Sequence, residues 1–219
     1  MIQENIIAIK KELPPEVKLV AVSKFHPAEA IREAYAAGQR SFGENRPQEF
    51  AKKVEALADL DLDWHFIGHL QTNKLKLVLP YAQLVQSVDS LHLLDAIQDW
   101  GKANDKLIRV LLELHIGAEQ TKTGFKEEEV LDLLFRADKY KSIRFCGLMG
   151  MATHTDSEED IRADFARIAD FRAYLRDLFP ELTDFTELSI GMSGDWKIAL
   201  DYGATIVRIG TAIFGERQY

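Results

Sequence analysis

Short apolar or β-branched runs alternate with longer amphipathic stretches along the whole chain. This alternation is typical of βα units whose strands form a parallel sheet. Several of the amphipathic stretches begin with proline or with a serine, as helix starts commonly do. The predicted strands are Lys18–Ser23, Arg40–Gly43, Trp64–Ile67, Leu84–Val88, Leu107–Leu114, Ile143–Met149, Phe185–Ser189 and Thr205–Ile209. The predicted helices between them are Pro27–Ala37, Pro47–Leu60, Asn73–Leu79, Ser90–Lys102, Lys126–Ala137, Ser157–Phe179 and Gly194–Asp201.

Eight strands separated by seven helices, with a short turn after the last strand, are the elements of a (β/α)8 TIM barrel. An extra amphipathic helix, Gln3–Leu13, stops at Pro14-Pro15 and is expected to close the barrel floor. The main alternative is an open doubly wound sheet, which usually has three spaced glycines after its first strand, and this sequence lacks them. A length of 219 residues, 47% of them hydrophobic, suits a single α/β barrel domain over residues 1–219.

The charge balance narrows the classes of partner. Asp and Glu number 35 against 27 Lys and Arg, so the formal net charge is −8. An acidic chain of this kind is a poor general binder of nucleic acid or of anionic membranes. No stretch has the apolar length of a membrane span or the pattern of a signal peptide, so we expect a cytoplasmic protein. The one cysteine, Cys146, forms no intrachain disulfide and is expected to be buried in its apolar run.

In barrels of this kind the functional groups lie at the C-terminal ends of the strands and in the loops that follow. Lys24 follows the apolar strand Leu19–Val22, so its stem leaves a buried wall. Partial burial lowers the pKa of an amine and frees it to form a Schiff base with a carbonyl. Many lysines at strand ends only extend into solvent, and position alone leaves both readings open.

The loops after the seventh and eighth strands are where such barrels frequently bind phosphate. The segment Ser189–Asp195 contains two glycines and enters a helix, with Ser193 as the expected N-cap. The segment Arg208–Gly215 follows the last strand and has glycines at both ends of its loop. Two loops therefore agree on a phosphate site, although Asp195 places a carboxylate nearby that either competes with an anion or caps its own helix.

His65 and His69 are four residues apart, which on a helix is a metal-binding spacing. The run Trp64–Ile67 is predicted to be a strand, where this spacing does not define one face, and no third ligand is near in the sequence. We therefore expect no metal site.

Seven short segments, in order from about Val17 to Gly215, carry a resemblance to a known family. They are Leu19–Lys24, Phe42–Asn45, Trp64–Lys74, Lys122–Phe125, Gly147–Met149, Leu188–Asp195 and Val207–Gly215. Together they resemble the pyridoxal phosphate homeostasis protein family, whose barrels bind pyridoxal 5'-phosphate (PLP) and are related to the N-terminal domain of alanine racemase, PLP fold type III. The sequence departs from the family pattern at Ile190 and in the loop Thr153–Asp156.

The resemblance implies that Lys24 holds PLP as a Schiff base and that Arg208 faces the nitrogen of its pyridine ring. A cation beside that nitrogen disfavours its protonation, so the ring is a weaker electron sink than one paired with a carboxylate. The cofactor-binding residues implied in this way are Lys24, Asn45, Met192, Ser193, Arg208, Gly210 and Thr211, with Ser193 and the amides of Gly210 and Thr211 on the phosphate.

The leading hypothesis for function is a monomeric PLP carrier that buffers the cofactor and delivers it to apo PLP-dependent enzymes, without efficient turnover of its own. Racemases of the related fold take a second base from an additional β domain, which is not expected here because the sequence ends at Tyr219. A slow amino-acid racemase or other small PLP enzyme remains an alternative, with His69, His115 or His154 as the second base. A PLP-free aldolase that forms a Schiff base on Lys24 is a further alternative.

Overall fold

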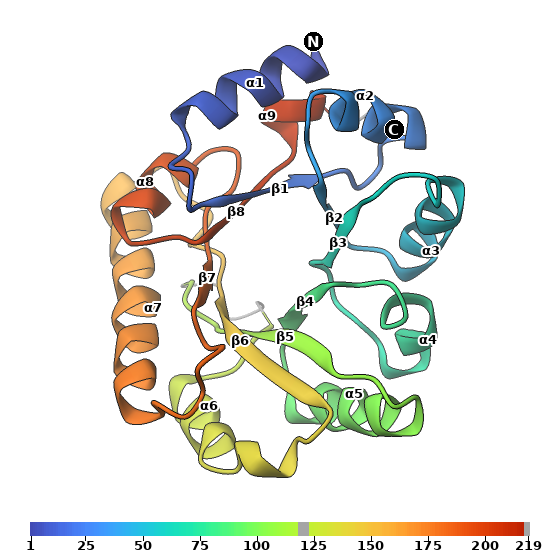
Figure 1. The fold of residues 1–219 in the computed structure, drawn as a ribbon. Helices are drawn as coiled ribbons and strands as arrows, with labels where there is room; N and C mark the ends of the chain where they lie inside the picture. The colour runs from blue at the N-terminus through green and yellow to red at the C-terminus, as the bar shows by residue number, and fades with distance from the viewer. Residues whose placement is uncertain (118–122, 217–219) are drawn as a thin grey trace.

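The computed structural model describes residues 1–117 and 123–216, where eight parallel strands form a closed barrel (Figure 1). The strands pair in sequence order, and β1 closes the barrel against β8 with Lys18 opposite Ile206 and Val20 opposite Arg208. The strands are β1 (Lys18–Val22), β2 (Ser41–Glu44), β3 (Asp63–Phe66), β4 (Leu84–Val88), β5 (Ile108–Glu113), β6 (Ile143–Met149), β7 (Glu187–Ser189) and β8 (Ile206–Ile209). The predicted fold class is therefore confirmed, and each strand lies within about two residues of its predicted bounds.

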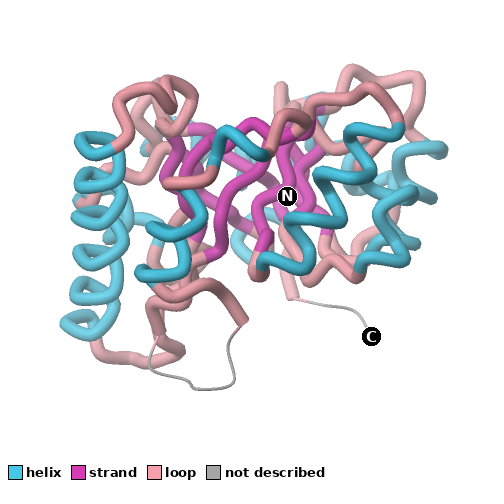
Figure 2. Tube along the Cα trace, turned by 90° about the horizontal axis from the view of Figure 1, so that it is seen from below, coloured by secondary structure: helices cyan, strands magenta, loops and turns pink. Residues whose placement is uncertain are grey.

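Helices surround the barrel on its outside (Figures 1 and 2). Within the described part of the chain, no helix is long and apolar enough to cross a membrane. The α-helices are α1 (Ile2–Glu12), α2 (Ala28–Ala36), α3 (Pro47–Ala56), α4 (Leu75–Val78), α5 (Leu91–Ala103), α6 (Glu127–Leu134), α7 (Glu158–Leu178), α8 (Trp196–Asp201) and α9 (Thr211–Phe214). Two short 3-10 helices, η1 (Thr72–Lys74) and η2 (Ala137–Lys139), precede α4 and follow α6.

The predicted position of the first helix is wrong, because α1 does not close the barrel floor. It lies in the outer ring beside α2 and α9 (Figure 1). Its apolar residues Ile6 and Ile9 are buried there, and the Asn5 amide donates a hydrogen bond to the carbonyl oxygen of Ile213 (3.0 Å). The short turn expected after the last strand is in fact the helix α9, and α1 covers it.

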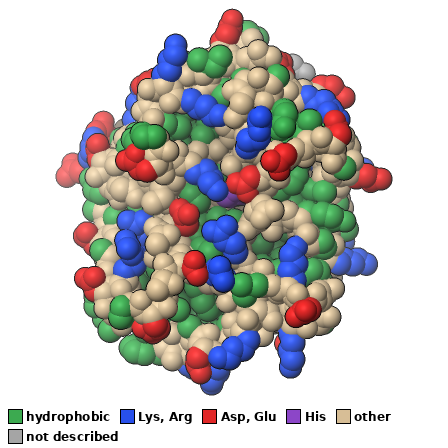
Figure 3. All heavy atoms as spheres, in the orientation of Figure 1, with side chains coloured by type: hydrophobic (Ala, Val, Ile, Leu, Met, Phe, Trp, Pro, Cys, Tyr) green, Lys and Arg blue, Asp and Glu red, His purple; other side chains and the backbone are tan. Residues whose placement is uncertain are grey.

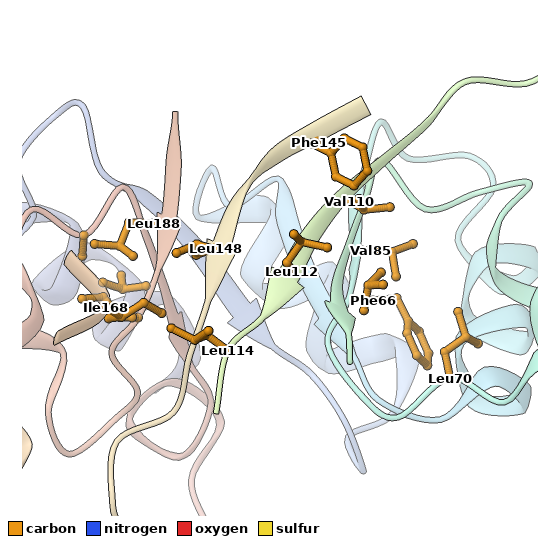
Figure 4. Packing of buried hydrophobic residues seen from close by; sticks show 14 of the residues in the cluster. Phe66, Leu70, Val85, Val110, Leu112, Leu114, Phe145, Leu148, Ile168 and Leu188 are labelled. Carbon is orange, nitrogen blue, oxygen red and sulfur yellow. The ribbon is translucent and has the colours of Figure 1, made fainter. Parts of the chain in front are cut away.

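Side chains alternate between the two surfaces of the barrel wall, as the pleat of a strand requires. Outward-facing residues such as Phe66, Val110 and Leu188 pack in one continuous core with the helices (Figure 4). A second, smaller cluster of buried residues fills part of the barrel interior. It comprises Val20, Leu84, Leu111, Cys146, Met149 and Ile206, which confirms the buried position predicted for the cysteine.

Gly147 interrupts the regular pairing of β6. The register between β5 and β6 shifts after Val110, and Gly147 has a φ of 143°. A Cβ atom at this position would lie 2.0 Å from the carbonyl oxygen of Glu187, so no other residue fits. The irregularity lies three residues before Gly150, whose carbonyl oxygen takes part in the site described below.

Candidate functional site

Lys24 lies in a tight turn directly after β1, at the barrel mouth where the parallel strands all end, and is half-buried. The turn is closed by a hydrogen bond from the backbone amide of His26 to the carbonyl oxygen of Ser23 (3.1 Å). The amide of Ser23 in turn continues the sheet by donating to Gly43 (3.1 Å). The strand-end position predicted for Lys24 is therefore present, with a backbone fixed on the β2 side.

Ser193 does not cap α8 as the sequence predicted, because the cap position is held by Asp195. Its hydroxyl oxygen instead accepts hydrogen bonds from the backbone amides of Gly210 (3.2 Å) and Ala212 (3.4 Å). The loops after β7 and β8 are thus joined through one serine, and Thr211 lies between the two donating amides and is exposed. Sequence reasoning found the residues but missed the contact, since it joins segments 17 and 19 positions apart.

Asp195 stabilises the loop after β7 rather than the start of its own helix. Its carboxylate accepts a hydrogen bond from the backbone amide of Met192 (2.5 Å). Met192 itself is 38% exposed at the rim, where it lines a cavity of about 610 Å³ together with His154 and Asp195. Asp195 occupies the N-cap position of α8, but its side chain makes no capping hydrogen bond, so the expected capping role is replaced by this contact within the loop.

Arg208 on β8 is almost fully buried, with 4% of its surface exposed. Its guanidinium donates to the carbonyl oxygens of Ser189 (2.7 Å) and Gly150 (3.0 Å) and to the hydroxyl of Ser189 (2.6 Å). Burial lowers the pKa of Arg208 to about 10, and the negative charges of Glu113 and Asp195 oppose that effect. It remains a cation at neutral pH, held in one orientation at the top of the barrel interior.

From Arg208 a chain of hydrogen bonds runs down through the barrel. The Ser189 hydroxyl donates to Oε1 of Gln86 (2.6 Å), and Nε2 of Gln86 lies 2.7 Å from Nδ1 of His65. Nε2 of His65 lies 3.1 Å from a carboxylate oxygen of Asp63. Because Gln86 offers an N–H to Nδ1, the histidine carries its proton on Nε2 and donates it to Asp63. Each donor in the chain therefore points away from Arg208.

These contacts account for the histidine pair in the sequence. His65 points into the barrel and both of its ring nitrogens are used in this chain. His69 lies beyond β3 with 64% of its side chain exposed, and its Nδ1 lies 3.1 Å from the carboxylate of Asp89. The two rings have separate partners and separate environments, because His65 lies on β3 and His69 lies in the loop that follows it.

Asn45, directly after β2, carries an unsatisfied polar atom. Its side-chain oxygen Oδ1 is buried and has no hydrogen-bond partner among the described residues. The neighbouring loop after β3 packs closely on it, since a Cβ atom at Gly68 would lie 2.3 Å from the carbonyl oxygen of Asn45. A buried acceptor without a donor is unfavourable, so this oxygen suits a ligand that carries a hydroxyl or N–H group.

Sequence reasoning missed Glu113, the last residue of β5. It is 5% exposed, and burial together with the negative charge of Asp89 raises its pKa to about 7. The signal was present in the strand pattern, because Glu113 is two residues after the interior residue Leu111 and so faces the same side. The carboxyl lies close enough to Arg208 and His69 for both charges to affect its pKa.

Fold and site together define the class: a parallel barrel with a half-buried lysine after β1 and amide and hydroxyl groups at the ends of β7 and β8. Such a barrel is suited to a carbonyl compound that carries a phosphate. The sequence matches the model of the family described as alanine racemase, N-terminal domain, over residues 1–218. The chain belongs to this family.

Curated relatives agree with one another in name. A pyridoxal phosphate homeostasis protein of Aquifex aeolicus is 43% identical over 202 residues, which cover 92% of this chain and 88% of that protein. A protein of the same name from Schizosaccharomyces pombe is 39% identical over 204 residues and covers 92% of this chain and 84% of the relative. The similarity therefore extends over nearly the whole of both chains.

Solved structures are similar to this chain as well. PipY of Synechococcus elongatus with PLP bound superposes with a TM-score of 0.91 at 38% identity, covering 98% of this chain and 100% of that one. An alanine racemase of Clostridium difficile superposes with a TM-score of 0.78 at 16% identity, and this chain covers 56% of its length. The second likeness concerns the fold alone.

Proposed function

We propose that this protein binds PLP and takes part in the homeostasis of the cofactor, with Lys24 as the covalent anchor. The observation that carries the proposal is the convergence of Lys24 with the loop pair joined by Ser193 at one end of the barrel. The names and bound ligand of relatives at 38–43% identity support it. As a cofactor, PLP supplies an aldehyde that reacts with amines and a ring that stabilises negative charge on a neighbouring carbon.

The residues present fit the functional groups of this cofactor. The hydroxyl of Ser193 and the amides of Gly210 and Thr211 would hold the phosphate, since hydroxyl and amide donors suit an anion. The Gly210 amide donates to the Ser193 hydroxyl oxygen (3.2 Å), and the phosphate would take the place of that acceptor. The unsatisfied oxygen of Asn45 would accept from the ring hydroxyl, and Met192 would cover the rim of the pocket. The side-chain oxygen of Asn45 is thus the atom of the site that most clearly needs a hydrogen-bond donor from a ligand.

Arg208 would face the ring nitrogen. Its guanidinium is fixed by Ser189 and Gly150 and stays charged at neutral pH, so it would keep the ring nitrogen unprotonated. A ring in that state withdraws electrons weakly, which favours holding the cofactor over using it. We therefore propose a carrier that buffers PLP in the cytoplasm as a monomer and delivers it to apo PLP-dependent enzymes.

The test is a visible absorption spectrum of the purified protein after addition of PLP, recorded beside the variant Lys24→Ala. We expect the parent to show the band of a Schiff base and Lys24→Ala to lack it. Lys10→Ala is the control, because its ammonium donates to the carbonyl oxygen of Gly38 in the outer ring of helices, away from the barrel mouth. The control should keep the band.

A band in both the parent and Lys24→Ala would assign the anchor to another lysine. The absence of a band in every protein would overturn the PLP proposal and favour the PLP-free aldolase, which borohydride would trap only with a phosphorylated sugar.

A further inference from the structure

We propose that Glu49 and Lys53 of α3 are positioning residues that hold the turn carrying Lys24. The inference rests on the proposed function, since it concerns the anchor of that site. The residues on either side of Lys24 are Ser23 and Phe25, and each is bonded to a side chain of α3. Neither α3 residue was singled out from the sequence, where both belong to a polar helix with no distinguishing pattern.

Lys53 is the centre of this contact. Only 6% of its surface is exposed, although it stands on a surface helix. Its ammonium donates to the carbonyl oxygen of Ser23 (2.8 Å), to Oε1 of Glu44 (2.7 Å) and to Oε1 of Glu49 (2.7 Å). An ammonium has three N–H groups, so this geometry uses all of them. A solvated lysine would have no reason to be buried with every donor directed at the protein.

Glu49 holds the other side of the turn. The same oxygen that accepts from Lys53 accepts a hydrogen bond from the backbone amide of Phe25 (2.8 Å). Phe25 has a φ of 69°, a left-handed conformation that is unfavourable for a bulky aromatic residue. The guanidinium of Arg46 lies 4.5 Å from the centre of the Phe25 ring and adds a second restraint. Backbone strain next to Lys24 is therefore maintained by specific contacts.

Glu44 makes the network depend on Lys53. Its side chain is fully buried. Its Oε1, which accepts from Lys53, also accepts a hydrogen bond from the Ser23 hydroxyl (2.6 Å). Its second oxygen has no partner among the described residues, and burial raises the pKa of the carboxyl against the opposing charge of Lys53. A buried carboxylate is strongly destabilising once its cation is removed. Loss of Lys53 would thus remove the donor to the Ser23 carbonyl oxygen and would also disturb Glu44, to which the Ser23 hydroxyl donates.

The consequence is a fixed starting point for the Lys24 side chain. An amine whose backbone is held in one conformation loses less freedom when it bonds to a ligand, so it reacts faster and binds more tightly. The ring of His26, two residues further on, stacks on Phe214 of α9 with 5.0 Å between centres. The turn of the anchor is therefore also packed against the helix that follows Gly210.

The experiment compares variants of α3 that differ in one contact. Glu49→Ala removes the acceptor of the Phe25 amide, whereas Glu49→Gln keeps an oxygen that can accept from it. Lys53→Met removes the ammonium and keeps the stem, and Lys52→Met is its matched control because Lys52 is exposed on the same helix. Two readouts are needed: the rate at which the absorption band forms with PLP, and hydrogen exchange of the Phe25 amide in the protein before PLP is added.

We expect Glu49→Ala to slow band formation about tenfold and to speed exchange of the Phe25 amide by a similar factor, as for the loss of one hydrogen bond to a charged group. Glu49→Gln should recover most of both effects, and Lys52→Met should behave as the parent. Equal rates and equal exchange in Glu49→Ala and the parent would overturn the inference, as would an identical defect in Glu49→Ala and Glu49→Gln.

Two outcomes distinguish a failure of this inference from a failure of the proposed function. If the parent itself gives no band with PLP, the proposed function fails, and the exchange of the Phe25 amide still decides whether Glu49 holds the turn. If Lys53→Met does not fold, the two Glu49 variants decide alone, because that side chain is only partly buried at 23% exposure.

Discussion

Replacement of Glu113 by glutamine tests the electrostatics of the barrel mouth. Burial, followed by the charge of Asp89, raises the pKa of this carboxyl from 4.5 to about 7, while Arg208, Thr123 and His69 oppose the shift. The Thr123 hydroxyl donates to Oε1 over 3.4 Å, a long contact that does little to stabilise the ionised form. The folded protein therefore retains a proton on Glu113 that the unfolded chain releases at lower pH.

The sign follows from the raised pKa. Below about pH 4.5 the carboxyl is protonated in both states, and folding bears no cost from it. Between about pH 4.5 and 7 the unfolded chain ionises first, so the free energy of unfolding falls as the pH rises. A pKa of about 7 in place of 4.5 corresponds to a loss of roughly 3 kcal/mol by the end of that window. Glutamine cannot ionise, so the Glu113→Gln variant lacks this loss.

The assay is urea unfolding of the PLP-free protein at several pH values from 4.5 to 8, followed by tryptophan fluorescence. We expect the free energy of unfolding of Glu113→Gln, relative to the parent, to increase with pH by roughly 3 kcal/mol. Glu55→Gln is the control, since Glu55 is an exposed glutamate on α3. A difference between Glu113→Gln and the parent that stays constant over this range would refute the reasoning, because Glu113 would then ionise as a solvated carboxyl does.

Two further predictions concern the hydrogen-bond chain in the barrel. Ser189→Ala deprives the buried Oε1 of Gln86 of its donor and should lower the free energy of unfolding by about 2 kcal/mol, or Tm by about 4–8 °C in calorimetry; a change within error of zero would contradict the chain. Although burial opposes it, hydrogen bonds from His65 and Ser41 hold the pKa of Asp63 well below its usual range. The stability that this lowered pKa contributes to the folded protein is complete above about pH 4 and is lost as the pH falls below it. Asp63→Asn should therefore flatten the acid limb of the plot of unfolding free energy against pH. Acid limbs that coincide in the variant and the parent would argue against this.

Strand pattern and fold-class rules were enough to predict the barrel and the end at which the candidate site residues lie. The position of Lys24 at a strand end was predicted because it directly follows an apolar run, which is local information, whereas its proposed role came from the family resemblance. The buried position of Cys146 was equally local, since its neighbours are apolar. Such features depend on a few consecutive residues and on the parallel arrangement, which brings all strand ends to one mouth.

Contacts between distant segments could not be predicted in this way. The sequence predicted a helix cap at Ser193, because serine often precedes a helix, but its hydrogen-bond partners lie in the segment that follows β8. The place of α1 depended on α9, a helix too short to show any periodicity. Lys53 gave no signal at all, because an exposed and a buried lysine on a polar helix have the same pattern. The interior position of Glu113 could have been predicted from the alternation of side chains along β5, because Glu113 lies two residues after the interior residue Leu111.

On the face of the molecule seen in Figure 3, acidic and basic side chains are intermingled, and apolar atoms lie between them. The excess of acidic residues therefore does not gather there into a single field. Local fields matter more at the barrel mouth, where Arg208 and Glu113 are close enough to shift each other's pKa.

Lys24 and Arg208 are supported from different directions, and this bears on how the proposed carrier would release its cofactor. The turn of Lys24 is held from outside the barrel by Lys53 and Glu49, and Arg208 is held from inside by Ser189. Both supports consist of protein groups alone, so the departure of a ligand removes none of the contacts that fix either residue. A site that keeps its geometry through release does not have to refold to bind again, and binding and release then occur without a large ordering cost. Such a site suits repeated uptake and delivery better than one that is assembled by its ligand.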